Sequence, residues 1–72
     1  MNFNNKLLIF FQKKYGKKIS INSKLFIDLG LDSFELVNLI NEIEKKFNKK
    51  YKPLKFIDFE KMNIEKFSKL FK

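Results

Sequence analysis

Apolar side chains recur at helical spacing between residues 33 and 48, and no other feature constrains the fold as strongly. Spacings of three and four residues place these side chains on one face of a helix, which other parts of the chain must cover. The apolar stripe consists of Leu36, Leu39, Ile40, Ile43 and Phe47. Asp32 precedes the stripe as a good N-cap, and Glu35 completes a capping-box pattern three residues later. The sequence therefore predicts a helix over 33–48.

Three further helices are predicted. Apolar residues recur at helical spacing near both ends of the chain, Pro53 marks a break or a first helical turn, and Asn63 is a suitable N-cap. No stretch alternates as a strand would. The remaining predicted elements are helices over 3–14, 54–59 and 64–71 and a long loop over 17–32. We expect one all-α domain over residues 1–72, a small four-helix bundle with a long first loop and a short third helix.

The composition excludes most kinds of enzyme. The 72 residues include no Cys and no His, which removes thiolate metal sites, the catalytic triad and the usual neutral-pH general base. A chain of this length gains only about 3–5 kcal/mol from a single core. The longest apolar run, residues 7–11, is far shorter than the roughly 20 residues of a membrane span. We expect a complete cytoplasmic protein that binds or carries and is not an enzyme.

The charge is high and unevenly distributed. Sixteen Lys and no Arg stand against eight Asp and Glu, and the net charge is +8. A basic chain suggests nucleic acid or an anionic membrane, but the side chain best suited to phosphate and guanine contacts is missing. Residues 25–44 instead contain five acids and no Lys. Either chance and helix-dipole preference explain this segment, or it is a site that faces basic partners.

The run from Asp28 to Val37 reads Asp-Leu-Gly-Leu-Asp-Ser-Phe-Glu-Leu-Val and leads into the strongest predicted helix. An ordinary explanation is that Gly30 makes a turn and that Asp32 and Ser33 are cap residues. The position also suits a phosphate ester on Ser33, because a helix N-terminus offers unpaired N–H groups and a positive dipole end. The preceding loop would leave the hydroxyl accessible to a modifying enzyme.

This run resembles the modification site of acyl carrier proteins, whose pattern is Asp-Leu-Gly-Leu-Asp-Ser-Leu followed by acidic and apolar residues. The similarity continues through Leu39-Ile40, Glu42-Ile43-Glu44 and Phe47. The chain length, the long first loop, the short third helix and the closing helix are also similar. The resemblance covers nearly the whole chain, and a ten-residue match at the start of the correct helix is a specific signal.

The resemblance implies that Ser33 accepts 4′-phosphopantetheine from coenzyme A, through a separate phosphopantetheinyl transferase that uses Mg²⁺. The thiol of that arm would hold an acyl or aminoacyl group as a thioester between acyl-loading and acyl-transfer enzymes. Asp32 would flank the modified residue and help to position the transferase's metal. The protein would hold no metal itself, would be a monomer, and would serve fatty acid, polyketide or a specialised acyl-transfer pathway.

The resemblance also implies roles for two sets of side chains on and beside the predicted helix over 33–48. Partner enzymes with basic docking patches would recognise Phe34, Glu35, Val37, Asn38, Asn41 and Glu44. The cargo would thread toward the interior of the bundle, lined by residues such as Leu36, Ile40, Phe47, Ile57 and Phe59.

Several positions depart from the family pattern. Members are usually strongly acidic, whereas this chain is basic. Phe34 stands where Leu is usual, Asn38 where an acid is usual, and Asn41 where an apolar contact is usual. Lys45 and Lys46 replace acids further along the helix. Docking would therefore rest on the start of the helix, and the ten Phe residues would leave a tighter interior for cargo.

Two other functions stay open at this point. A small basic helical module would bind nucleic acid or anionic lipid through Lys, with a steep salt dependence and no role for Ser33. A carrier-fold scaffold would have lost modification, and Ser33→Ala would then be silent. The acidic segment and the lack of Arg weigh against the first, and the intact Gly-Leu-Asp-Ser run weighs against the second. We expect a carrier that binds no nucleic acid and does not insert stably into membranes.

Overall fold

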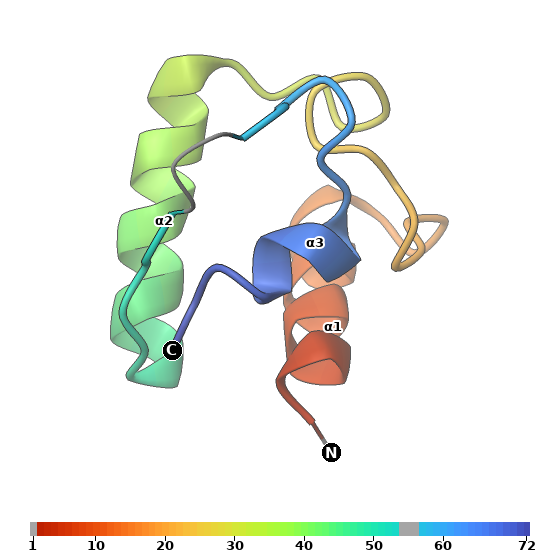
Figure 1. Cartoon of the computed structure of the whole chain (residues 1–72). Coiled ribbons are helices and arrows are strands. Elements are labelled where there is room, and N and C mark those ends of the chain that lie inside the picture. Colours follow the sequence, from red (N-terminus) through yellow and green to blue (C-terminus); the bar gives the residue numbers. More distant parts are fainter. Residues whose placement is uncertain (1, 54–56) are drawn as a thin grey trace.

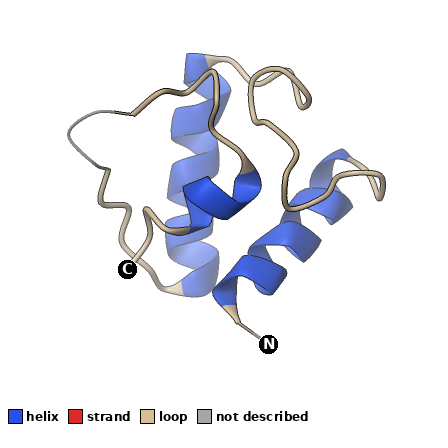
Figure 2. Cartoon of the chain, turned by 45° about the vertical axis from the view of Figure 1, so that its right-hand side comes forward, coloured by secondary structure: helices blue, strands red, loops and turns tan. Residues whose placement is uncertain are grey.

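The computed structural model describes residues 2–53 and 57–72, and three helices lie within them (Figure 1). They are α1 (Phe3–Tyr15), α2 (Ser33–Phe47) and α3 (Ile64–Ser68). No strand occurs among the described residues, and loops connect the helices (Figure 2). The all-α prediction is therefore confirmed, and the helices predicted over 3–14 and 33–48 agree with α1 and α2 to within one residue.

An Asn or Asp side chain caps the start of each of these helices. The accepted N–H group lies three residues on in each case: Asn2 accepts from Asn5 (3.0 Å), Asp32 from Glu35 (2.7 Å) and Asn63 from Lys66 (2.8 Å). Asn48 ends α2 in the left-handed backbone region, with φ of 54°. Local sequence thus sets the helix starts, because short polar side chains replace the missing intrahelical acceptors.

The helix predicted over 64–71 is shorter in the structure and ends at Ser68. Beyond it the chain turns, and Phe71 forms an isolated β-bridge with Tyr51. Lys50 and Lys72 exchange backbone hydrogen bonds of 2.9 Å in both directions. This pairing satisfies backbone groups that a longer helix would have satisfied internally, and it keeps Phe71 buried.

The short helix predicted over 54–59 is not found in the part that the structure describes. Residues 54–56 lie outside the described residues, and residues 57–59 are not helical. The described architecture is therefore three helices joined by long connections, and it does not include a fourth helix.

The core lies where the three helices meet, with α3 against α1 (Figure 1). Leu7, Phe11, Ile43 and Ile64 are completely buried, as is Phe67. The rings of Phe11 and Phe67 meet edge to face, with 6.2 Å between their centroids. Such aromatic pairs add about 0.5–1.5 kcal/mol beyond the burial of their area, so the many Phe residues help a short chain to build a stable core.

The long loop between α1 and α2 is tied to the residues around the start of α3. Three backbone hydrogen bonds form the tie: Leu25 N–H to Met62 (3.0 Å), Ile64 N–H to Ser23 (3.2 Å) and Glu65 N–H to Ile21 (3.1 Å). Leu25 is completely buried, and Leu31 is 5% exposed. These hydrogen bonds and buried side chains attach the loop to the rest of the fold just before α2 begins.

Within the described residues, no helix has the length and the apolar character needed to cross a lipid bilayer.

Candidate functional site

Ser33 is the first residue of α2, and its side chain is exposed. The carboxylate of Asp32, also exposed, accepts the Glu35 N–H at 2.7 Å, and the Asp32 carbonyl accepts the Leu36 N–H at 3.0 Å. Ser33 Oγ makes no hydrogen bond with any other residue that the structure describes. A nucleophilic hydroxyl therefore projects into solvent from the positive end of a 15-residue helix.

The turn before Ser33 depends on Gly30. Its φ is 71°, in the left-handed region, although an added Cβ would meet no atom within 4 Å. The glycine is therefore required by the backbone angle and not by lack of space. The N–H of Gly30 donates to the Phe26 carbonyl (3.1 Å), and the N–H of Leu31 donates to the Leu25 carbonyl (3.2 Å). This turn brings the chain from buried Leu31 to exposed Ser33 within two residues.

The five acids of residues 25–44 have different surroundings. Four are engaged within the molecule: Asp28 accepts the Lys24 N–H (2.7 Å), Asp32 the Glu35 N–H (2.7 Å), Glu44 the Tyr51 N–H (2.9 Å), and Glu42 binds Lys14 Nζ (3.0 Å). The carboxylate of Glu35 makes no such contact with a described residue. In a complete capping box this carboxylate would also accept the Asp32 N–H. That hydrogen bond is absent, so the predicted capping box is only half formed. Glu35 is thus available to another molecule.

Three large apolar side chains are strongly exposed. Ile27 is 66%, Phe34 76% and Val37 57% exposed. Phe34 and Val37 lie one turn apart on α2, and Asn38 and Asn41 beside them are also exposed. The loop that bears Ile27 lies at the same end of the molecule as the start of α2 (Figure 1). Clustered exposed apolar side chains are typical of contact surfaces.

Ile27 was not among the predicted contact residues. The available signal was the run Leu25-Phe26-Ile27, because three consecutive apolar residues in a turn cannot all face the core. Glu44, which was predicted to face partners, is half-buried, and its carboxylate is occupied by the Tyr51 N–H.

The predicted cargo-lining side chains are spread over different parts of the core. Leu36 is buried, and Ile40 packs partly against the same cluster. Phe47 meets the ring of Phe3 edge to face, with 5.4 Å between centroids. The Phe59 ring stacks on Phe26, with centroids 5.6 Å apart.

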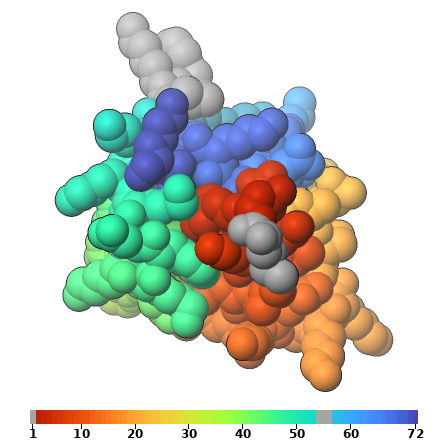
Figure 3. Space-filling model, turned by 90° about the horizontal axis from the view of Figure 1, so that it is seen from below, coloured from red at the N-terminus to blue at the C-terminus, as the bar shows by residue number. Residues whose placement is uncertain are grey.

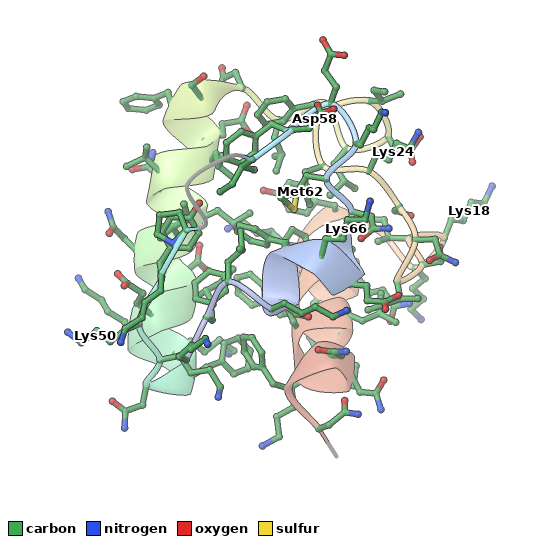
Figure 4. All side chains as sticks on the ribbon, viewed as in Figure 1. Lys18, Lys24, Lys50, Asp58, Met62 and Lys66 are labelled. Atoms are coloured by element: carbon green, nitrogen blue, oxygen red, sulfur yellow. The ribbon has the colours of Figure 1, made fainter. Side chains whose placement is uncertain are left out.

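Ile57, the fifth of these residues, lines a hollow of about 400 Å³ beside α3. Met62 and Leu70 form its buried floor, and Asp58 and Lys66 stand at its rim (Figure 4). None of the other four predicted residues lines this hollow.

Among the described residues, three titrating groups have pKa values that depart from their ordinary values, and all lie outside residues 25–44. The hydrogen bond to Glu42 raises the pKa of the Lys14 ammonium, and burial raises the pKa of the Tyr15 and Tyr51 hydroxyls. Among the described residues, no group of three or more potential ligand side chains could hold a metal ion. The functional features at the start of α2 are thus the exposed Ser33 hydroxyl and the contact surface formed by the exposed Phe34 and Val37.

Comparison with known families identifies one relationship. A family model described as a phosphopantetheine attachment site matches residues 11–71, which include the long loop, Ser33 and all of α2. Searches of curated proteins and of solved structures return no match.

Proposed function

The chain belongs to the phosphopantetheine attachment-site family, and we propose that Ser33 is the residue that bears the group. Domains of this family attach 4′-phosphopantetheine covalently and are carriers, not enzymes. They work with a phosphopantetheinyl transferase and with acyl-handling enzymes. When bound, the group supplies a thiol that holds cargo as a thioester.

The exposed Ser33 hydroxyl at the first position of α2 carries this proposal. Its Oγ would form the phosphate ester, and the helix end beside it favours negative charge. The first intrahelical hydrogen bond is made by the Leu36 N–H to Asp32, so the N–H groups of Ser33 and Phe34 precede the helical ladder. The residues present fit a phosphodiester at this place.

Asp32 supports attachment in two ways. Its carboxylate is held in one direction by the Glu35 N–H at 2.7 Å, and it remains exposed beside Ser33. A carboxylate with one oxygen still open to solvent can supply a ligand to the transferase's Mg²⁺, which prefers oxygen donors. Asp32 thus acts as a helix cap in the free protein and as a metal-positioning group during modification.

The partner surface in this proposal surrounds Ser33. Phe34 and Val37 provide apolar contact, Glu35 provides an unpaired negative charge, and Asn38 and Asn41 provide hydrogen-bonding groups. Ile27 extends the same surface across the loop because it is exposed at the same end of the molecule. Glu44 contributes less, since its carboxylate already accepts the Tyr51 N–H. Basic docking patches on acyl-loading and acyl-transfer enzymes would match Asp32 and Glu35.

The cargo is an acyl or aminoacyl group. Of the predicted cargo residues, Ile57 lines the hollow beside α3, whose volume of about 400 Å³ lies at the small end of ligand pockets. Phe47, another of the predicted cargo residues, packs edge to face against the rings of Phe3 and Phe10. We propose that the protein carries short cargo in the cytoplasm, for fatty acid, polyketide or specialised acyl-transfer synthesis.

The test is the intact mass of the protein after incubation with coenzyme A, Mg²⁺ and a broad-specificity phosphopantetheinyl transferase. The wild type should gain one phosphopantetheine, and Ser33→Ala should gain none. Ser20→Ala is the matched control, because Ser20 is also exposed, and it should be modified like the wild type. Modification of Ser33→Ala, or none in the folded wild type, would overturn the assignment.

A further inference from the structure

A groove between α1 and the second half of α2 combines apolar side chains with lysines, and the proposed modification of Ser33 does not involve it. It encloses about 420 Å³. Its floor is formed by Ile9, Phe10 and Phe47, and lysines stand along its rim. Figure 3 views this end of the molecule, where atoms of α1, in red and orange, adjoin the green atoms of α2. We refer to this space as the α1–α2 groove.

The floor of the groove is apolar and lies between two helices that are inclined to each other (Figure 2). Phe10 is 8% exposed, and its ring meets Phe47 edge to face with 5.9 Å between centroids. Ile9 and Phe47 are half-buried, so part of each side chain remains open to a ligand. The early residues of α1 meet the late residues of α2, as the contact of Phe3 with Phe47 shows.

The rim of the groove carries unpaired positive charge on both walls. Lys6 and Lys13 lie seven residues apart on α1, which places them two turns apart on one wall. Lys46 stands on the opposite wall, on α2. These three lysines form no ion pair with any residue that the structure describes. The one acid of the groove, Glu42, is neutralised by Lys14 at 3.0 Å.

The groove is separate from Ser33. Glu42 follows Ser33 by nine residues, which corresponds to about half a rotation around the helix and about 14 Å along its axis. The groove therefore opens on another side of α2, and a molecule bound in it would leave Ser33 and the exposed Phe34 free.

We propose that the α1–α2 groove docks an acidic amphipathic helix of a partner protein. An apolar stripe on such a helix would cover Ile9, Phe10 and Phe47, and carboxylates on its two flanks would meet the lysines of both walls. A flat bilayer surface would not reach the recessed floor. Nucleic acid would neutralise the lysines and leave the apolar floor uncovered. A helix lying in the groove between α1 and α2 satisfies the charge and the floor together.

A defined probe tests this proposal. An 18-residue helical peptide with a leucine stripe flanked by glutamates would be titrated into the ¹⁵N-labelled, unmodified protein. The expected result is saturable change in the NMR signals of residues 6–14 and 42–47. Lys6→Glu/Lys13→Glu/Lys46→Glu should weaken binding at least about tenfold. The control variant Lys18→Glu/Lys24→Glu/Lys50→Glu has the same net charge and alters exposed lysines elsewhere (Figure 4), and it should stay within about twofold.

The floor is tested without any change of charge. Ile9→Gln should weaken peptide binding about tenfold, because the glutamine amide would face the leucine stripe. Circular dichroism would confirm that each variant keeps the wild-type helix signal. Equal weakening by the two lysine variants would overturn the proposal, since it would indicate unspecific attraction. So would signal changes centred on Phe34 and Val37, or no saturable binding at all.

Two other probes test the choice of occupant. Duplex DNA and phosphatidylglycerol vesicles should bind the groove variant and the control variant equally. If either probe depended on the groove lysines as strongly as the peptide does, the proposed occupant would be wrong. Because binding is measured on unmodified protein, and can be repeated on Ser33→Ala, its outcome is independent of whether Ser33 bears the group.

Discussion

The two ends of α2 use their charged and apolar side chains in opposite ways. In its first two turns, Phe34 and Val37 are exposed, and the Glu35 carboxylate has no partner among the described residues. In its last two turns, Glu44 accepts the Tyr51 N–H and Phe47 packs on α1. We refer to the first two turns of α2 as its free end, because these side chains are open to other molecules, and to the last two turns as its structural end, because these side chains make contacts within the fold.

The difference shows that residue type alone does not reveal a role. Glu35 and Glu44 are both acids on the same helix, and both were assigned to partner contact from the sequence. Glu44 stabilises the fold through a backbone N–H at 2.9 Å, whereas Glu35 has no such task. The first end can therefore change its contacts without disturbing the fold, and the second end cannot.

The largest expected effect separates function from stability. Ser33→Ala should lose all loading and change the free energy of unfolding by less than about 0.5 kcal/mol, because Asp32 still caps α2. Ile43→Ala should lower the free energy of unfolding by about 2–5 kcal/mol, since Ile43 is completely buried. Urea denaturation followed by circular dichroism, together with intact mass, measures both. A stable Ile43→Ala or an unfolded Ser33→Ala would remove the distinction between the two ends.

Two substitutions with a smaller expected effect separate the role of Asp32 as a helix cap from its role in modification. Asp32→Ala should lower the free energy of unfolding by about 1 kcal/mol, because the Glu35 N–H loses its acceptor. Asp32→Asn should keep nearly full stability, since Asn caps helices as well as Asp does. The Asn variant should nevertheless be modified more slowly by the Mg²⁺-dependent transferase. Modification at the wild-type rate would mean that Asp32 is only a cap.

Charge reversal compares the two ends directly. Glu35→Lys and Glu44→Lys have the same net charge. We expect Glu35→Lys to slow modification by the transferase more at low salt than at high salt, with little change in stability. Glu44→Lys should cost about 1 kcal/mol of stability by removing the acceptor of the Tyr51 N–H, with a smaller effect on rate. Equal modification rates for the two variants at low salt would contradict the assignment of Glu35.

The smallest expected effect is a loss of stability at alkaline pH. Burial raises the pKa of Tyr51 above its ordinary 10.0, and Glu42 raises that of Lys14 above 10.5. A raised pKa in the folded state stabilises the protein below the unfolded value, and this contribution is lost as pH rises through the folded value. Stability should therefore be flat from pH 7 to about 9.5 and should fall above about pH 10. Tyr51→Phe should reduce the slope of that fall in pH-dependent urea denaturation, and an unchanged slope would exclude Tyr51 as a cause.

The sequence predicted what local chemistry determines. The bounds of α1 and α2 follow from helical spacing and short-range capping, and Asp32 accepts the Glu35 N–H as predicted. The position of Ser33 at the start of α2 follows from the same cap. These features involve residues only a few positions apart, where side-chain type and spacing are informative.

What the sequence did not predict depends on contacts between distant residues. The pairing of Tyr51 with Phe71 shortens α3, and no local sequence pattern predicts a β-bridge between two isolated residues. The engagement of Glu44 depends on where Tyr51 is placed by that pairing. The α1–α2 groove arises only when Lys46 is brought opposite Lys6. Long-range pairing of this kind leaves no periodic signal in either segment.

The tie between the long loop and the start of α3 has a consequence for synthesis. Ile21, Ser23 and Leu25 lie before Ser33, yet their hydrogen-bond partners run from Met62 to Glu65. The loop and Ser33 are synthesised before residues 62–65, and the loop that presents Ser33 can close only when those residues are free to pair with it. A transferase that recognises the closed loop would therefore act on chains in which residues 62–65 have already paired with it, so that modification would also report that this part of the fold has formed.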